Sequence, residues 1–354
     1  VASTNFPYGE NLIEPGASYR VQGQSHPGEA WQKSESGMGE DHVIEFEYTS
    51  NGENEVFLFY VSNGEDLVLK AYHAQASLFE TRTTDENNHV VIELADRLGR
   101  KVLKKVQANV AGSEWAETYY VYEDFGNLRY VLPPEGVKEI NTQATGFPYA
   151  PGPTLLAKWA FQYKYDDRQR MIEKKVPGAE PVFIIYDQRD RLVLTQDGNQ
   201  RMGSKNEWTF TKYDALNRPI LTGIIDKGAS TVDQIRGEAE AISVFFENRG
   251  GTVHGYTNNS YHSVSNANNY LTATYYDDYT FPHAGSYTFV EELGNPAAFG
   301  RVKGQVTGSK VKNLDGSNTW LESVTYYDDR YRVIQTQTQT LLGGVDRVSN
   351  HYDF

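Results

Sequence analysis

Apolar and polar residues alternate with a period of two along several short stretches of the chain. Residues 44–48 read IEFEY, and two further β-favouring stretches, 55–61 and 66–72, are separated by Asn63-Gly64. A period of two places the apolar side chains on one face of a strand, and Asn-Gly favours a tight hairpin turn. The pattern therefore predicts an all-β fold of antiparallel β-hairpins. The stretch 335–340 reads QTQTQT and is polar on both faces, which predicts a solvated or edge strand.

One segment has helical spacing instead. Val232, Ile235, Ala239, Ile242 and Phe246 recur every three or four residues. Before them, Thr-x-x-Gln at 231–234 fits a capping box, which marks the start of a helix. We therefore expect one short amphipathic helix near 231–248, lying over the sheet.

Three other segments do not read as strands. Residues 135–140, after two prolines, favour a helical turn. The Pro- and Gly-rich residues 146–153 are typical of a connector, and the Asn-, Ser- and Tyr-rich residues 258–270 are typical of a loop.

The most specific signal is a repeated motif in which Tyr-Asp is followed by Arg five positions after the Tyr. An apolar pair or near-pair comes next in each copy, as the start of a strand. The copies recur within the range of roughly 20–50 residues that is typical of stacked repeats. Residues 96–102 are a degenerate copy, and 276–277 keep only Tyr-Asp. The motif positions are Tyr165, Asp166 and Arg170; Tyr186, Asp187 and Arg191; Tyr213, Asp214 and Arg218; Tyr327, Asp328 and Arg332; and Tyr122 of a further degenerate copy.

The chemistry of this motif indicates a structural role. An Asp side chain can accept backbone N–H groups within a tight turn, and an Arg can bind turn carbonyls or a carboxylate of the neighbouring unit. A single hairpin cannot bury its own apolar face, so each must lie beside the next. We therefore assign these Tyr, Asp and Arg residues to building turns and joining repeats, and we predict no catalytic residue.

These motifs resemble the YD repeats of the RHS (rearrangement hotspot) family, whose pattern is Tyr-Asp, a few variable residues, Gly-Arg and an apolar strand. Residues 120–135, 342–348 and the stretch from Gly28 to 48 also resemble blocks of large secreted bacterial RHS proteins. The chain departs from the pattern before the Arg, where the family's Gly is replaced by Gln169, Asp190, Asn217 and Tyr331. That departure leaves the geometry of these turns open.

The resemblance implies a spiralling ribbon of β-hairpins that forms a hollow shell around a C-terminal toxin. The shells of the family end in a self-cleaving plug that contains Asp-Pro. No Asp-Pro occurs here, so we expect plug and cargo to lie outside these residues. We divide the chain into a strand-rich segment (1–80), a YD-repeat array (81–227), a helix-plus-loop insertion (228–270) and an array continuing beyond the chain end (271–354). The absence of an initial Met suggests a removed leader or an excised piece.

Composition excludes several other classes of function. Lys and Arg number 33 against 47 Asp and Glu, a net charge of −14, which argues against binding to nucleic acid. With no cysteine, the chain has no disulfide, thiolate metal site or cysteine nucleophile. No apolar run reaches the about 20 residues of a membrane span. The eight histidines lack metal-binding spacing, although His254 and His262 flank one loop. We expect no cofactor and no metal site.

Three functions remain, and we favour the first. It is a non-enzymatic shell segment that encloses or presents a toxin domain lying outside this chain. The second is a cell-surface adhesin or carbohydrate-binding scaffold, for which the tyrosines of 256–270 are the first place to look. The third is an enzyme built on paired carboxylates such as Asp166-Asp167, Asp277-Asp278 and Asp328-Asp329. A calcium site at 313–318 is less consistent with the sequence than a hairpin turn.

The favoured function sets the expected partners and location. The partners are the rest of the same RHS polypeptide and its toxin cargo, with secretion machinery or surface glycans as further candidates. The expected location is secreted or at the bacterial cell surface.

Overall fold

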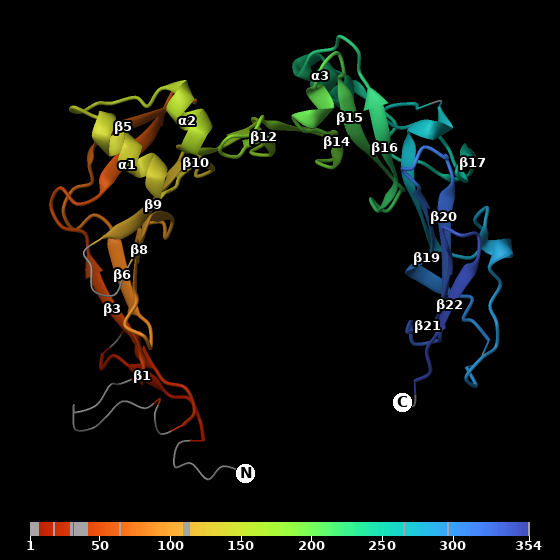
Figure 1. Cartoon of the computed structure of the whole chain (residues 1–354), viewed down its shortest axis with the longest axis horizontal. Coiled ribbons are helices and arrows are strands. Elements are labelled where there is room, and N and C mark those ends of the chain that lie inside the picture. Colours follow the sequence, from red (N-terminus) through yellow and green to blue (C-terminus); the bar gives the residue numbers. More distant parts are fainter. Residues whose placement is uncertain are drawn as a thin grey trace. The chain divides into compact units, whose positions relative to one another are not determined.

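The computed structural model describes residues 7–16, 18–28, 31, 42–63, 65–108, 114–264, 266–295 and 297–352. The chain divides into two compact units, 1–181 and 182–354, shown in Figure 1. The four-segment division made from the sequence follows motifs and stays a prediction. Gly64, most of the block 28–32 and the last two residues lie outside the described residues.

The first unit is a ribbon of antiparallel strands in which nearly every strand pairs with the next along the chain. Its strands are β1 (Asn11–Ile13), β2 (Val21–Gln24), β3 (Ile44–Ser50), β6 (Phe79–Thr84), β7 (Val90–Ala95), β8 (Lys101–Gln107), β9 (Trp115–Tyr122), β10 (Leu128–Leu132), β11 (Phe161–Tyr165) and β12 (Met171–Lys175). The alternating stretch 44–48 lies in β3, as predicted.

A separate layer covers one face of this ribbon. It contains the predicted hairpin, β4 (Phe57–Ser62) paired with β5 (Asp66–Tyr72), and two helices, α1 (Pro134–Gln143) and α2 (Pro153–Trp159), that lie beside it in Figure 1. Leu69 of the hairpin, Leu103 of the ribbon and Ile140 of α1 are fully buried in one core. α1 contains the predicted helical turn, whereas α2 begins at the end of the stretch expected to be only a connector.

The second unit repeats this arrangement. Its ribbon consists of β13 (Val182–Tyr186), β14 (Leu192–Gln196), β15 (Glu207–Tyr213), β16 (Pro219–Asp226), β18 (Tyr270–Asp277), β19 (Val302–Lys312), β20 (Trp320–Tyr327), β21 (Val333–Gln339) and β22 (Val345–Ser349), all antiparallel. Two insertions, 231–264 and 278–295, lie on one face, and we call them the cover. The cover includes α3 (Val232–Ala241) and β17 (Arg249–Val253).

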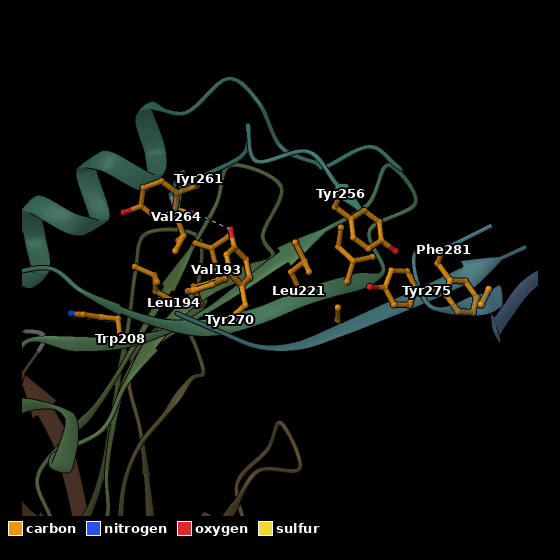
Figure 2. Close-up of a cluster of buried hydrophobic side chains, with 14 of the residues drawn as sticks. Val193, Leu194, Trp208, Leu221, Tyr256, Tyr261, Val264, Tyr270, Tyr275 and Phe281 are labelled. Carbon is orange, nitrogen blue, oxygen red and sulfur yellow. Dashed lines mark hydrogen bonds between the residues drawn. The ribbon is translucent and has the colours of Figure 1, made fainter. Parts of the chain in front are cut away.

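The cover and the ribbon share an aromatic core. Tyr256 and Tyr261 of the cover lie over Leu194, Leu221 and Tyr275 of the ribbon (Figure 2). On the opposite face the register places hydroxyl side chains in rows across the strands, such as Thr211, Thr222 and Thr272, or Ser309, Ser323 and Thr338. These six side chains are half-buried and uncharged, and the second row ends at the exposed Asp346, opposite Thr338.

The predicted helix is present, with both hydrogen bonds of its capping box, but it ends at Ala241 rather than at 248. Extended backbone after Ala241 carries Glu247 to the ribbon, where its carboxylate binds the ammonium of Lys212 at 2.8 Å. Residues 257–260 donate four further hydrogen bonds to this carboxylate, which is fully buried. The helix stops because these distant partners outweigh its local periodicity.

The expectation for QTQTQT was wrong. Residues 335–339 lie in β21, which pairs with β20 on one side and β22 on the other, so the strand is central. Gln335 and Gln337 are 1% and 5% exposed. Gln335 accepts from the N–H of Val290 and donates to its carbonyl, and Gln337 donates to the carbonyl of Thr288. The glutamines therefore hold a cover segment by its backbone, which makes their polarity compatible with burial.

Candidate functional site: a ladder of Asp–Arg turns

Each complete repeat folds its motif into the same turn. In the third copy, Asp214 Oδ1 accepts the backbone N–H groups of Leu216 and Arg218, both at 2.9 Å. The Asp214 N–H donates to the Arg218 carbonyl, and the Asn217 N–H donates to the Asp214 carbonyl. The same four bonds occur at Asp166, Asp187 and Asp328, and at Asp96 of the degenerate copy. The Asp side chain thus replaces missing ladder partners within the turn.

The Arg of each motif closes the turn through its side chain. Arg218 Nε donates to Asp214 Oδ2 at 2.7 Å. The distance is 2.7–2.9 Å in the turns of Asp96, Asp166, Asp187 and Asp328. Burial alone would raise the pKa of Asp166, but hydrogen bonds from the side chain and backbone of Arg170 and the backbone of Arg168 hold it below its ordinary value. The turn carboxylates are therefore partners of arginine rather than free acids.

The residue before the Arg takes a left-handed backbone in every copy. The φ angles of Gln169, Asp190, Asn217 and Tyr331 lie between 60° and 62°. Gly99 and Gly126 occupy the same position in the degenerate copies, with φ of 77° and 87°. The departure from Gly therefore keeps the geometry of the turn and adds steric strain to it.

Within each unit, a Tyr of the motif joins its repeat to the one before. Arg191 stacks on the ring of Tyr213 at 4.6 Å, and the Tyr213 hydroxyl donates to the Leu192 carbonyl at 2.6 Å. Further stacked pairs are Arg100 on Tyr122, Arg218 on Tyr276 and Arg332 on Tyr352. Tyr165, Tyr276, Tyr327 and Tyr352 likewise donate to carbonyls of preceding strands. The Tyr thus supplies both the stacking surface for an Arg and a hydrogen bond to a carbonyl of the neighbouring hairpin.

The half-copy Tyr276-Asp277 borrows its arginine from the preceding repeat. Arg218 donates from Nη1 and Nη2 to the two carboxylate oxygens of Asp277 at 2.8 and 2.5 Å, while it still binds Asp214. These bonds from Arg218 hold the pKa of Asp277 below its ordinary value, against the opposing effect of burial. Arg218 therefore links the turns of Asp214 and Asp277, which are far apart in the sequence.

Two further turns belong to the ladder. Only one of them follows a Tyr that was identified from the sequence motif. Glu123, after Tyr122, takes the place of the Asp and binds Arg129 at 2.8 Å. At Asp85, Oδ1 accepts the N–H groups of Asn87 and His89, and His89 stands where the Arg would be. The motif missed this last turn because it has neither Tyr nor Arg. The sequence signal for this turn is Asp85 with an Asn three positions later, because Asn tolerates a left-handed backbone; the φ of Asn88 is 62°.

The remaining chemistry of the site is limited. Among the described residues, no group of three or more His, Asp or Glu side chains could hold a metal ion. The first carboxylates of Asp166-Asp167, Asp277-Asp278 and Asp328-Asp329 all bind arginine. Residues 313–319 form the hairpin turn between β19 and β20, with the Asn313 N–H bonded to the Thr319 carbonyl. No helix of the described residues is long and apolar enough to cross a membrane.

Among the described residues, the hollows outside the core include two that could hold a ligand-sized group. One, of about 230 Å³, lies beside the Asp214 turn, between Arg218, Arg249 and Tyr276, and its arginines are already paired with carboxylates. The other is an open depression of about 900 Å³ in the first unit, lined by Tyr72 and Phe147.

No family model matches the chain, and no curated protein matches it. Similar chains occur among solved structures of Tc toxins. One belongs to the Photorhabdus luminescens Tc holotoxin pore (12% identity, 81% of this chain, TM-score 0.32). Others belong to TcdB2-TccC3 (10%, 95%, 0.34) and to TcdB2-TccC3 without its hypervariable C-terminal region (11%, 96%, 0.34). This chain spans 16–17% of the length of those chains.

At this level of identity the similarity concerns the fold alone. The strands and turns themselves define the class: an all-β repeat protein of antiparallel hairpins.

Proposed function

We propose that this chain is a non-enzymatic wall segment of an RHS-repeat shell that encloses or presents a toxin domain lying outside these residues. The ladder of turns carries the proposal. Five hairpins close with the same Asp–Arg turn, and tyrosines join neighbouring hairpins, so hairpins can be added in series.

The two faces of the second unit support a wall. One face is packed under the cover, and the other presents uncharged hydroxyl rows in a chain whose net charge is −14. A pair of these hydroxyls, on Thr222 and Thr272, bond to each other at 2.6 Å. Hydroxyls that are paired in this way offer an enclosed polypeptide few strong binding sites.

The experiment is protease protection of the complete gene product. The domain that follows the repeats should resist digestion within the intact protein and be cut rapidly when expressed alone at the same concentration. Equal digestion in both forms, or a gene that ends without a further domain, would exclude the proposal.

The adhesin alternative has one observation in its favour. The tyrosines first considered for it, Tyr256, Tyr261 and Tyr270, are at most 8% exposed and cannot offer their rings to a sugar. The open depression beside Phe147, which is 44% exposed, combines aromatic rings with Asn54 and Gln75. A glycan array tests it: saturable binding lost in Phe147→Ala but kept in Phe125→Ala, an exposed control that does not line the depression, would support an adhesin.

A further inference from the structure

Three histidines of the second unit are held within the cover with a ring nitrogen that has no hydrogen-bond partner. The atoms are Nε2 of His254, Nε2 of His262 and Nδ1 of His283. His254 and His262 also have left-handed backbones, with φ of 49° and 58°. A closed cover therefore holds these side chains in places that suit a neutral ring and do not suit a charged one.

His254 is packed between aromatic rings. Its ring centroid lies 4.5 Å from that of Trp320 and 5.4 Å from that of Tyr270. The charged groups facing it are Lys310 and, paired with that lysine at 2.8 Å, Glu322. Burial, with a smaller contribution from Lys310, lowers the pKa of His254 to about 4.

His262 lies in a more positive environment. The facing charges are Lys227 and Lys212, each of which is already paired, with Glu238 and Glu247 respectively. Burial, followed by these two lysines, lowers the pKa of His262 to about 3. Protonation would place a third cation beside two whose carboxylates are taken.

His283 has its proton fixed on one nitrogen. A carbonyl only accepts, so the contact of 3.2 Å to the Ser323 carbonyl means that Nε2 donates and that Nδ1 carries the lone pair. Its ring packs against Tyr275, Phe281 and Tyr287. Glu322 and Lys310 are the charged groups facing it, and burial makes the net direction of its pKa downward.

We propose that the cover is an acid-sensitive lid: on acidification, protonation of His254, His262 and His283 detaches it from the ribbon. Detachment gives each ring access to water, which solvates the imidazolium that the closed state excludes. The face uncovered is the aromatic one in Figure 2, which includes Tyr275 and Leu221. The proposal does not depend on what the ribbon encloses.

The sign and size of the effect follow from proton linkage. Each histidine has an ordinary pKa of 6.5 when the cover is open and a lower one when it is closed. The open state therefore binds more protons, and opening becomes more favourable as the pH falls below 6.5. Between its closed-state pKa and 6.5, one such group raises the opening constant by about tenfold per pH unit, so His254 and His262 together raise it by about a hundredfold, and His283 adds to the effect in the same direction.

The absence of cysteine allows a direct measurement on the full chain. Ala239, on α3, is fully buried against the ribbon, and Ala160 is fully buried in the first unit. We would introduce Ala239→Cys or Ala160→Cys and follow labelling by 4,4′-dithiodipyridine from pH 7 to pH 4.5, each rate divided by that of the unfolded chain. Protection of the thiol at position 239 should fall at least a hundredfold per pH unit below pH 6, whereas that at position 160 should change tenfold or less.

Variants assign the effect to the histidines. His254→Phe and His262→Phe, which fill the same aromatic sites, should each reduce the pH dependence of protection by about tenfold per pH unit. His283→Gln, which keeps a donor for Ser323, should reduce it as well. His89→Gln, in the first unit, should leave it unchanged. A protection change below tenfold per pH unit in the otherwise unaltered chain overturns the proposal, even if the variants fold poorly. So does parallel exposure at positions 239 and 160, which would mean general acid unfolding.

Discussion

The strain at the residue before each turn arginine gives a prediction of increased stability. Gln169→Gly replaces a residue whose φ is 60° with the one that tolerates this backbone without steric cost. A left-handed conformation costs an ordinary residue about 1–2 kcal/mol. The greater freedom of Gly in the unfolded chain costs about 0.5–1 kcal/mol on folding and offsets part of the relieved strain. We therefore expect Gln169→Gly to raise the free energy of unfolding by about 0.5–1 kcal/mol.

The same turn at two other places provides matched controls. Asn217→Gly should lower stability slightly, because Asn already tolerates a left-handed backbone and its Oδ1 accepts a hydrogen bond from Arg191 Nη1 at 2.9 Å. Gly99→Ala should lower the free energy of unfolding by about 0.5–1 kcal/mol, the same balance of strain and unfolded-state freedom with the opposite sign. Apart from Gly99 and its two chain neighbours, no atom of the described residues lies within 4 Å of a Cβ built on Gly99, so that loss would come from the backbone alone.

The assay must treat the two units separately, because they need not unfold together. Hydrogen exchange with mass spectrometry at increasing urea gives a transition for peptides of each unit. Residues 99 and 169 should affect the first unit and residue 217 the second. A decrease in stability for Gln169→Gly, or an unchanged transition for Gly99→Ala, would refute the reasoning that backbone strain is stored at this position.

Three other substitutions test individual contacts. Arg170→Ala, Arg191→Ala and Arg218→Ala should each lower the free energy of unfolding by about 1–3 kcal/mol, with Arg218 the largest because it binds Asp214 and Asp277; unchanged melting of all three would contradict an inter-repeat role. Lys212→Met should cost about 3–5 kcal/mol in urea unfolding, because it leaves the carboxylate of Glu247 buried without its cation, and adding Glu247→Gln should recover part of the loss. Gln337→Leu removes the donor to the Thr288 carbonyl and should speed hydrogen exchange in 287–292 more than in α3; equal exchange in both segments would show that the glutamine does not hold this part of the cover.

Structural features that depend on residues close in the sequence could be predicted, whereas features that depend on residues far apart in the sequence were missed. The Asp of each turn binds backbone groups two and four residues away, so the motif can be recognised in the sequence. The end of α3 depends on Glu247 and Lys212, which lie 35 residues apart. The burial of Gln335 depends on Val290, 45 residues away, and no local pattern distinguishes such a glutamine from an exposed one. The Asp85 turn is local as well, but it lacks the two residue types by which the others were found.

Acid should act on the cover and on the ladder in different pH ranges. The turn carboxylates of Asp166, Asp277 and Asp328 have pKa values below the ordinary 3.8. A depressed acid pKa contributes stability above its unfolded value and loses it only as the pH falls through the folded one, so the ladder should weaken only below about pH 4. The cover histidines lose stability from pH 6.5 downward. Between these limits the ribbon keeps its turns while its cover loosens, so the surface it presents can change without loss of the repeat structure that supports it.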